Sequence, residues 1–211
     1  MKIVIGTRGS ELALAQTRQI AGQLSALAPN IQTDIEIIRT TGDVQAGSLR
    51  GMGGQGVFTK ELEKALIEKR IDVAVHSLKD LPSQFAPELY LVATPQREDV
   101  RDVIIADLAI QNIFGLPMGA KIGTGSARRQ AQLRALRPDL NVQDIRGNLD
   151  TRIKRVTEGD YEAVILAAAG LHRLKWNARI NCYLTTEEIL PAAGQGAIGL
   201  QMLLQVLGLE S

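Results

Sequence analysis

Aromatic residues make up only 3% of this 211-residue chain. Single-stranded nucleic acids are commonly held by base stacking on aromatic rings, so this scarcity argues against a nucleic-acid binder. The formal net charge of +1 likewise argues against a surface that binds polyanions over its whole extent. The 45% hydrophobic content is mainly aliphatic, and this composition is typical of a soluble α/β protein.

Cysteine and histidine are also scarce. Cys182 is the only cysteine, which excludes a disulfide within the chain. His76 and His172 have no second histidine, cysteine or acid at ligand spacing, so we expect no metal site. Met1 and Lys2 lead directly into a short strand with no long apolar run, from which we expect a cytoplasmic protein without a membrane segment.

Basic charge is concentrated in one part of the chain. Residues 121–155 hold nine Lys and Arg against three Asp, a local charge of +6 that leaves −5 for the rest of the chain. Such clustering indicates a localised anion-binding region instead of a uniformly basic surface.

The hydrophobic pattern alternates between strands and helices. In the first half we expect strands over 2–6, 34–39, 71–76 and 89–94 and helices over 11–27 and 60–69. In the second half we expect strands over 103–106, 121–124, 142–146 and 163–168, helices over 127–136 and 149–158, and a short helix near Leu171. The alternation predicts two α/β domains, hinged near 96–100, each with a mostly parallel sheet flanked by helices. No internal repeat is evident.

The stretch "VAVHSLKDLP" places charged residues directly after a buried strand. Pro82 cannot continue a ladder, so Ser77 to Leu81 should lie at the carboxyl end of that strand, where open α/β sheets bind ligands. Asp80, preceded by Lys79, is the candidate for chemistry, since an ionised carboxylate stabilises a developing cation. The alternative is a loop aspartate that caps a turn.

Three strand-to-helix corners carry arginine beside a capping residue. They are "IGTRGSELAL" with Arg8 and Ser10, "GTGSARRQ" with Ser126, Arg128 and Arg129, and "DIRGNLDTR" with Arg146, Asn148 and Arg152. Cations in a first helical turn oppose the helix dipole unless an anion sits at the same helix end. Solvated surface arginines remain an alternative for any one corner, but three together favour a ligand with several carboxylates.

The loop "GMGGQG" matches G-x-G-x-x-G at Gly51, Gly53 and Gly56. A dinucleotide site is disfavoured because the loop does not directly follow a strand and the expected acid is misplaced. We expect a mobile loop or lid.

Together these motifs resemble one family, the porphobilinogen deaminases or hydroxymethylbilane synthases of tetrapyrrole (haem) biosynthesis. The matching stretches are "GTRGSELALAQ", "GVFTKELEKALIE", "DVAVHSLKDLP", "REDVRDV", "GTGSARRQAQL", "IRGNLDTR", "AVILAAAGLHRL" and "LPAAGQGAIGLQ", in family order over nearly the whole chain. The resemblance implies a fold like the type II periplasmic binding proteins, with a double crossing between domains. Domain one would comprise 1–96 plus 197–211 and domain two 97–196.

The resemblance also implies a transferase that joins four porphobilinogen units head to tail into hydroxymethylbilane. Asp80 would be the catalytic carboxylate, contacting pyrrole nitrogens and assisting the loss of ammonia. Carried over by position, the residues that hold carboxylates of cofactor, substrate or product would be Arg8, Ser10, Lys79, Ser126, Arg128, Arg129, Arg146, Arg152 and Arg173, with Gln195 lining the cleft. The implied cofactor is dipyrromethane, with no metal and no nucleotide, in a monomer that binds neither nucleic acid nor membrane.

Two features depart from the family pattern. Gln55 stands in the glycine loop where the family usually has lysine. The family's third domain, whose cysteine carries dipyrromethane, has no counterpart in these residues, and Cys182 matches no cofactor position. We therefore expect Cys182 to be a small buried hydrophobe and the chain alone to carry no covalent primer. The alternatives that remain are an impaired or inactive truncated form and a two-domain binding protein for a small polycarboxylate.

Overall fold

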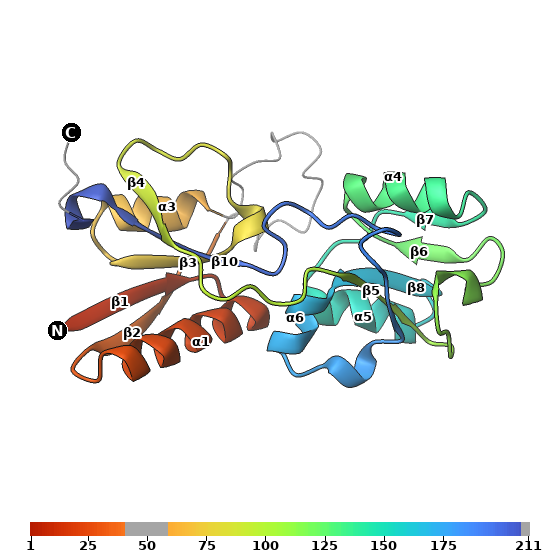
Figure 1. Ribbon diagram of the computed structural model, residues 1–211, viewed down its shortest axis with the longest axis horizontal. Coiled ribbons are helices and arrows are strands. Elements are labelled where there is room, and N and C mark those ends of the chain that lie inside the picture. The colour runs from red at the N-terminus through yellow and green to blue at the C-terminus, as the bar shows by residue number, and fades with distance from the viewer. Residues whose placement is uncertain (41–58, 208–211) are drawn as a thin grey trace. The chain divides into compact units, whose positions relative to one another are not determined.

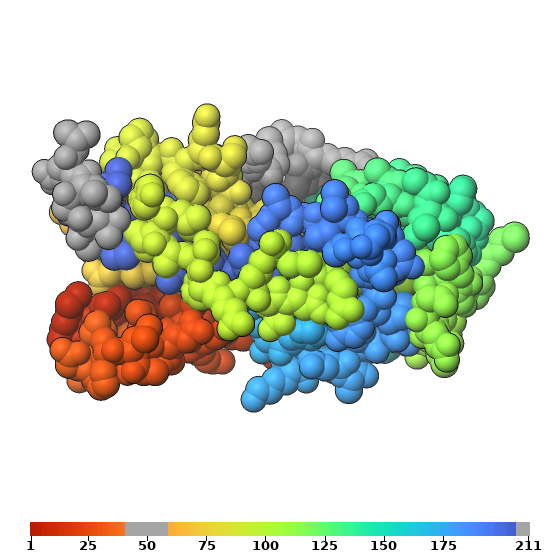
Figure 2. All heavy atoms as spheres, viewed as in Figure 1, coloured from red at the N-terminus to blue at the C-terminus, as the bar shows by residue number. Residues whose placement is uncertain are grey.

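A computed structural model describes residues 1–40 and 59–207, which are drawn in colour in Figures 1 and 2, with the other residues in grey. The chain divides into two compact units: unit 1 is Met1–Arg97 with Ala197–Ser211, and unit 2 is Glu98–Gly196. The glycine loop, with Gly51, Gly53, Gln55 and Gly56, lies outside the described residues, so its expected role as a lid stays a prediction.

Unit 1 is a five-stranded sheet with helices on both faces (Figure 1). Its elements are β1 (Lys2–Thr7), α1 (Glu11–Leu27), β2 (Gln32–Ile37), α3 (Lys60–Ile67), β3 (Val73–Ser77), the 3-10 turn η2 (Leu78–Asp80), β4 (Leu89–Ala93), β10 (Ile198–Leu203) and η5 (Leu204–Leu207). The strand order is β2-β1-β3-β10-β4. Strand β1 pairs in parallel with β2 and β3, whereas β10 runs antiparallel between β3 and β4, so β10 alone is reversed.

The helices α1 and α3 cover opposite faces of the unit 1 sheet because successive strand residues point to opposite sides. Ala74 packs in a cluster with Leu62 and Leu66 of α3. Val75, the next residue along β3, packs with Ile20 of α1. The apolar spacing of each helix thus matches one face of β3.

Unit 2 repeats this design. Its elements are β5 (Asp102–Ala106), η3 (Ile113–Gly115), β6 (Lys121–Gly123), α4 (Ala127–Leu136), β7 (Asn141–Gln143), α5 (Leu149–Thr157), β8 (Ala163–Ala167), α6 (Ala168–Arg173), η4 (Asn177–Arg179) and β9 (Cys182–Tyr183). The strand order is β7-β6-β8-β5-β9, in which β6 pairs in parallel with β7 and β8 and β5 runs antiparallel to β8 and β9. Each sheet therefore has one reversed strand in the same position.

Matching contacts show how closely the two units correspond. The backbone N–H of Val4 in β1 donates to Asp72 Oδ2 at 2.7 Å, immediately before β3. In unit 2 the N–H of Lys121 donates to Glu162 Oε2 at 2.6 Å, immediately before β8. A structural repeat is present although the sequence shows none.

The predicted fold class, α/β with helices flanking sheets in two parts, is confirmed. Helices α1 and α4 have the bounds predicted from the sequence. The expected strand 142–146 was too long: β7 ends at Gln143, because its partner β6 ends at Gly123. The helix expected over 60–69 ends at Ile67, because Lys69 adopts a left-handed φ of 56°.

Strands β9 and β10 were not predicted. Both pair with strands far away in sequence, so local periodicity carries little signal for them. In the described part of the chain, no helix combines the length and apolarity needed to cross a bilayer. The same residues contain no cluster of three or more histidines, cysteines or acids that could hold a metal ion.

Candidate functional site

Asp80 lies on a short turn at the carboxyl end of β3, as the sequence predicted. The turn is held by the N–H of Leu78, which donates to Ala197 O at 3.0 Å, and by the N–H of Leu81, which donates to Leu78 O at 3.2 Å. The side chains of Lys79 and Asp80 are both exposed. The backbone is thus fixed at both ends of the turn, while the carboxylate remains accessible to a ligand.

His76 anchors the strand just before this turn. Its Nε2 lies 3.0 Å from the amide oxygen of Gln201, and because that oxygen only accepts, Nε2 carries the proton. Gln201 in turn donates to Glu63 Oε1 at 3.4 Å. The side chain of His76 is therefore paired with another side chain. Burial lowers the pKa of His76 to about 4 and keeps the ring neutral.

Arg8 lies at the corner between β1 and α1. Ser10 begins that helix by accepting a hydrogen bond from the N–H of Ala13 at 3.3 Å. Because β1 and β3 are parallel neighbours, their carboxyl ends share one edge of the sheet. The positive charge of Arg8 also contributes to lowering the pKa of His76. Unit 1 therefore places Arg8 and the turn with Lys79 and Asp80 at the same sheet edge.

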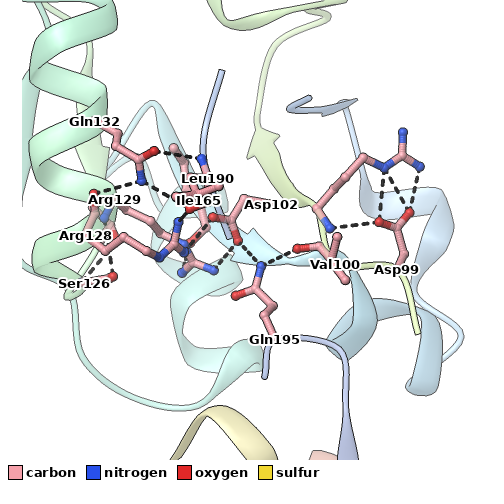
Figure 3. Close-up of polar contacts among 12 residues, drawn as sticks. Asp99, Val100, Asp102, Ser126, Arg128, Arg129, Gln132, Ile165, Leu190 and Gln195 are labelled. Atoms are coloured by element: carbon pink, nitrogen blue, oxygen red, sulfur yellow. Dashed lines mark hydrogen bonds and ion pairs between the residues drawn. The ribbon is translucent and has the colours of Figure 1, made fainter. Parts of the chain in front are cut away.

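The corner between β6 and α4 holds the second predicted arginine cluster (Figure 3). Ser126 begins the helix by accepting from the N–H of Arg129 at 3.4 Å. The guanidinium Nη2 of Arg129 donates to Asp102 Oδ1 at 2.6 Å, and Nη2 of Arg128 donates to Asp102 Oδ2 at 2.8 Å. The side chain of Asp102 is fully buried. Both arginines thus share one internal carboxylate.

From the sequence we expected an anion near Arg128 and Arg129 and attributed it to a ligand. In the structure, Asp102 of the protein itself is that anion. Burial raises the pKa of its carboxyl, but the hydrogen bonds and charges of Arg129 and Arg128 outweigh burial and lower the pKa below its ordinary value. Sequence reasoning missed this residue. The available signal was an acid in "REDVRDV" directly before the apolar run Val103–Ile105, because a buried carboxylate needs a counterion.

Gln195 also belongs to this cluster. Its Nε2 donates to Asp102 Oδ1 at 2.8 Å and to Val100 O at 2.7 Å (Figure 3). Arg128 Nη1 donates to Leu190 O, and Gln132, one turn along α4, exchanges hydrogen bonds with the backbone of the same residue. The segment from Leu190 to Gln195 is thereby fastened to both α4 and β5.

The third corner, between β7 and α5, is more open. Arg146 is exposed and its Nε donates to Asp144 Oδ2 at 3.0 Å. Arg152 Nε donates to Gly147 O at 2.8 Å. Asn148 occupies the N-cap position, as predicted, but its side chain makes no capping hydrogen bond. These two hydrogen bonds, to Asp144 and Gly147, stay within the corner.

The remaining predicted arginine, Arg173, ends α6. Its Nη2 donates to Gly196 O at 2.6 Å, and burial lowers the pKa of its guanidinium despite the nearby charge of Glu98. His172, for which no metal role is expected, lies 3.1 Å from Glu98 Oε1 through Nδ1 and 2.9 Å from the Tyr183 hydroxyl through Nε2. The sequence gives little sign of these partners, because they come from segments outside the helix that carries His172.

Cys182 is 6% exposed and packs in an apolar cluster with Ile104 and Leu184. Burial raises the pKa of its thiol, which disfavours the reactive thiolate. The structure therefore gives Cys182 the environment of a small buried hydrophobe.

A family model described as "Porphobilinogen deaminase, dipyromethane cofactor binding domain" matches residues 3–205. The chain belongs to the porphobilinogen deaminase family. The porphobilinogen deaminase of Syntrophobacter fumaroxidans is 47% identical over 201 residues, 95% of this chain and 65% of that protein. That of Syntrophus aciditrophicus is 48% identical over 198 residues, 93% of this chain and 64% of that protein. The chain thus spans about 65% of the length of these relatives.

Solved structures with little sequence identity share the fold. A putative lipoprotein from Actinomyces odontolyticus has a TM-score of 0.54 at 12% identity and covers 95% of this chain and 82% of its own. The periplasmic VFT2 domain of BvgS from Bordetella pertussis has a TM-score of 0.53 at 17% identity, with 96% and 80% covered. These likenesses show a two-domain fold of the type II periplasmic binding protein kind, as the resemblance implied.

Proposed function

We propose that this chain carries the site for deamination and head-to-tail condensation of porphobilinogen in tetrapyrrole biosynthesis. The observation that carries the proposal is the exposed Asp80 on a braced turn, at the same sheet edge as Arg8, in a member of this family. An accessible carboxylate beside cationic residues suits a substrate that becomes a cation while bearing carboxylates of its own.

Porphobilinogen is an aminomethyl pyrrole with one acetate and one propionate side chain. In the proposed reaction its protonated amine leaves as neutral ammonia, which takes the electron pair of the broken carbon–nitrogen bond, and a methylenepyrrolenine cation forms. Asp80 accepts a hydrogen bond from the pyrrole N–H and stabilises the positive charge that develops. The free α-carbon of the growing chain then attacks, a carbon–carbon bond forms, and the proton on that α-carbon is lost to solvent.

The cationic corners bind the side-chain carboxylates in this proposal. Charge-assisted hydrogen bonds from arginine recognise carboxylates with both strength and directionality. The family pattern places Arg8, Ser10, Lys79, Ser126, Arg128, Arg129, Arg146, Arg152, Arg173 and Gln195 at this binding site, and of these Arg129 and Gln195 are buried and bonded to Asp102.

Dipyrromethane fits the same donor set, because its acetate and propionate groups match the guanidinium groups at the corners. Arg128 and Arg146, which retain exposed surface, would hold it. When bound, it supplies the pyrrole carbon to which the first unit is joined. Cys182 does not fit as its point of attachment, since the thiol is buried and its pKa is raised.

We also propose that the protein works as a cytoplasmic monomer, without nucleic-acid or membrane partners. The low aromatic content and near-neutral net charge support the absence of a nucleic-acid partner.

The experiment is to incubate the purified chain with porphobilinogen and to measure ammonia release and pyrrole consumption, with binding followed by calorimetry. We expect binding accompanied by ammonia release in proportion to pyrrole consumed. Binding without any ammonia release would contradict the proposal and favour a polycarboxylate-binding protein. Absence of binding would contradict both.

A further inference from the structure

Three residues expected at the ligand site, Arg128, Arg129 and Gln195, converge on a single carboxylate of the protein itself. Asp102 accepts from all three at 2.6 to 2.8 Å (Figure 3). They come from α4 and from the segment before β10, so Asp102 joins elements that are far apart in sequence. The cluster raises the question of which of the three can still reach a ligand.

Burial separates the two arginines. The side chain of Arg129 is 7% exposed, whereas that of Arg128 is 24% exposed. Arg129 also donates from Nη1 to Ile165 O at 3.0 Å. Its Nε is buried and has no hydrogen-bond partner among the described residues, so no ligand reaches that atom without a rearrangement.

The side-chain nitrogen of Gln195 is likewise engaged in hydrogen bonds within the protein. Its side-chain nitrogen has two hydrogens, and they match the two acceptors found, Asp102 Oδ1 and Val100 O. The residue is 0% exposed. Arg128, by contrast, uses two of its five N–H donors on Asp102 and Leu190 and keeps part of its surface open.

We propose that Asp102 is the positioning residue of this corner: it holds Arg128 ready for an external carboxylate, and Arg129 and Gln195 influence the ligand only through Asp102. The inference rests on the proposed function for the identity of the ligand. Asp102 separates two guanidinium groups that would otherwise repel each other. Arg129 balances the charge of the buried carboxylate, and Arg128 is held at both Nη atoms while part of its side chain stays exposed.

The first test needs no ligand. Parent, Asp102→Asn, Arg129→Met and the double variant are compared by urea unfolding, with Arg134→Met, an exposed residue of the same helix, as the control. Breaking a buried ion pair costs more than removing both partners. We therefore expect the unfolding midpoint to fall in Arg129→Met and to recover in the double variant. A double variant less stable than Arg129→Met would overturn the pairing.

The second readout reports the position of Arg128 directly. In nitrogen-15 spectra of arginine side chains, a held guanidinium gives separate Nη signals and a freely rotating one gives averaged signals. We expect separate signals for Arg128 in the parent and averaged signals in Asp102→Asn, with Arg128→Lys used for assignment. Separate Arg128 signals that persist in folded Asp102→Asn would overturn the positioning role, since loss of stability alone does not produce averaging.

The third readout is porphobilinogen affinity by calorimetry, at a temperature where every variant is folded. Arg128→Met should weaken binding about 10- to 100-fold, the loss of one charge-assisted hydrogen bond or more. In the Asp102→Asn background, adding Arg129→Met should change affinity by less than about threefold. A further loss of about tenfold there would show that Arg129 contacts the ligand and would overturn the proposal. If the parent does not bind porphobilinogen, the proposed function fails, while the unfolding and spectroscopic tests still decide the role of Asp102.

Discussion

The guanidinium Nη2 of Arg129 lies 2.6 Å from Oδ1 of Asp102, a residue 27 positions earlier in the chain. This contact changes how the arginine pair of α4 is understood. Two cations in a first helical turn are unfavourable without an anion, and the protein provides that anion internally. The number of arginines in a cluster therefore does not predict the number of carboxylates on the ligand, because some of the arginines are paired with acids of the protein itself.

Stability should depend on pH through His76. Its pKa is about 4 in the folded protein against 6.5 for an ordinary histidine, so the unfolded chain binds more protons between these values. Stability should therefore fall as pH drops from 6.5 to 4, by about 3 kcal/mol from this residue. Urea unfolding at steps of pH measures the slope. His76→Gln, which keeps a hydrogen-bonding group for Gln201, should lose this component, and an unchanged slope in the variant would refute the assignment.

Gly196 should not tolerate a side chain. It has φ +85°, and a Cβ there would lie 2.4 Å from the backbone oxygen of Glu98. Gly196→Ala should cost about 2–4 kcal/mol, since both left-handed strain and a collision with backbone are added. Gly119 is the matched control, because it has φ +75° with nothing within 4 Å of the same position.

Gly119→Ala should cost only the left-handed strain, about 1 kcal/mol. The free energies of unfolding of both variants come from urea titrations. Equal losses would show that the contact with Glu98 does not determine the need for glycine at position 196.

Cys182 should not carry a covalent pyrrole. The thiol is 6% exposed and burial raises its pKa, so the thiolate needed for reaction is disfavoured. Intact-mass spectrometry of the chain should give the mass of the polypeptide alone, and alkylation should be slow in buffer and fast in urea. An adduct of dipyrromethane mass that disappears in Cys182→Ser would contradict this prediction.

Features set by local sequence were predicted well, and features set by distant partners were not. Helices α1 and α4 have the expected bounds because Ser10 and Ser126 cap them and their apolar spacing lies within the helix itself. The turn with Asp80 was recognised because a proline follows a β-branched strand.

Features that depend on long-range contacts were not predicted, because the residues that determine them are far apart in the sequence. Strand β10 pairs with β3 across more than one hundred positions. The role of Asp102 as a partner of Arg129 becomes apparent only in the folded protein, where α4 contacts β5. The repeated strand order of the two units is also not evident from the sequence. Equivalent contacts use different residues: the carboxylate that accepts the backbone hydrogen bond is Asp72 in unit 1 and Glu162 in unit 2.

The central claim is that Asp80 performs the deamination, and it is tested by ammonia release from porphobilinogen in the parent and in Asp80→Asn. Glu88→Gln, an exposed acid of the same unit, is the control for loss of one negative charge. We predict that Asp80→Asn lowers the rate at least about 100-fold, because an amide does not stabilise the developing cation as a carboxylate does. Porphobilinogen affinity and the unfolding midpoint should change little, and Glu88→Gln should behave like the parent. Ammonia release by Asp80→Asn within threefold of the parent rate would contradict the account.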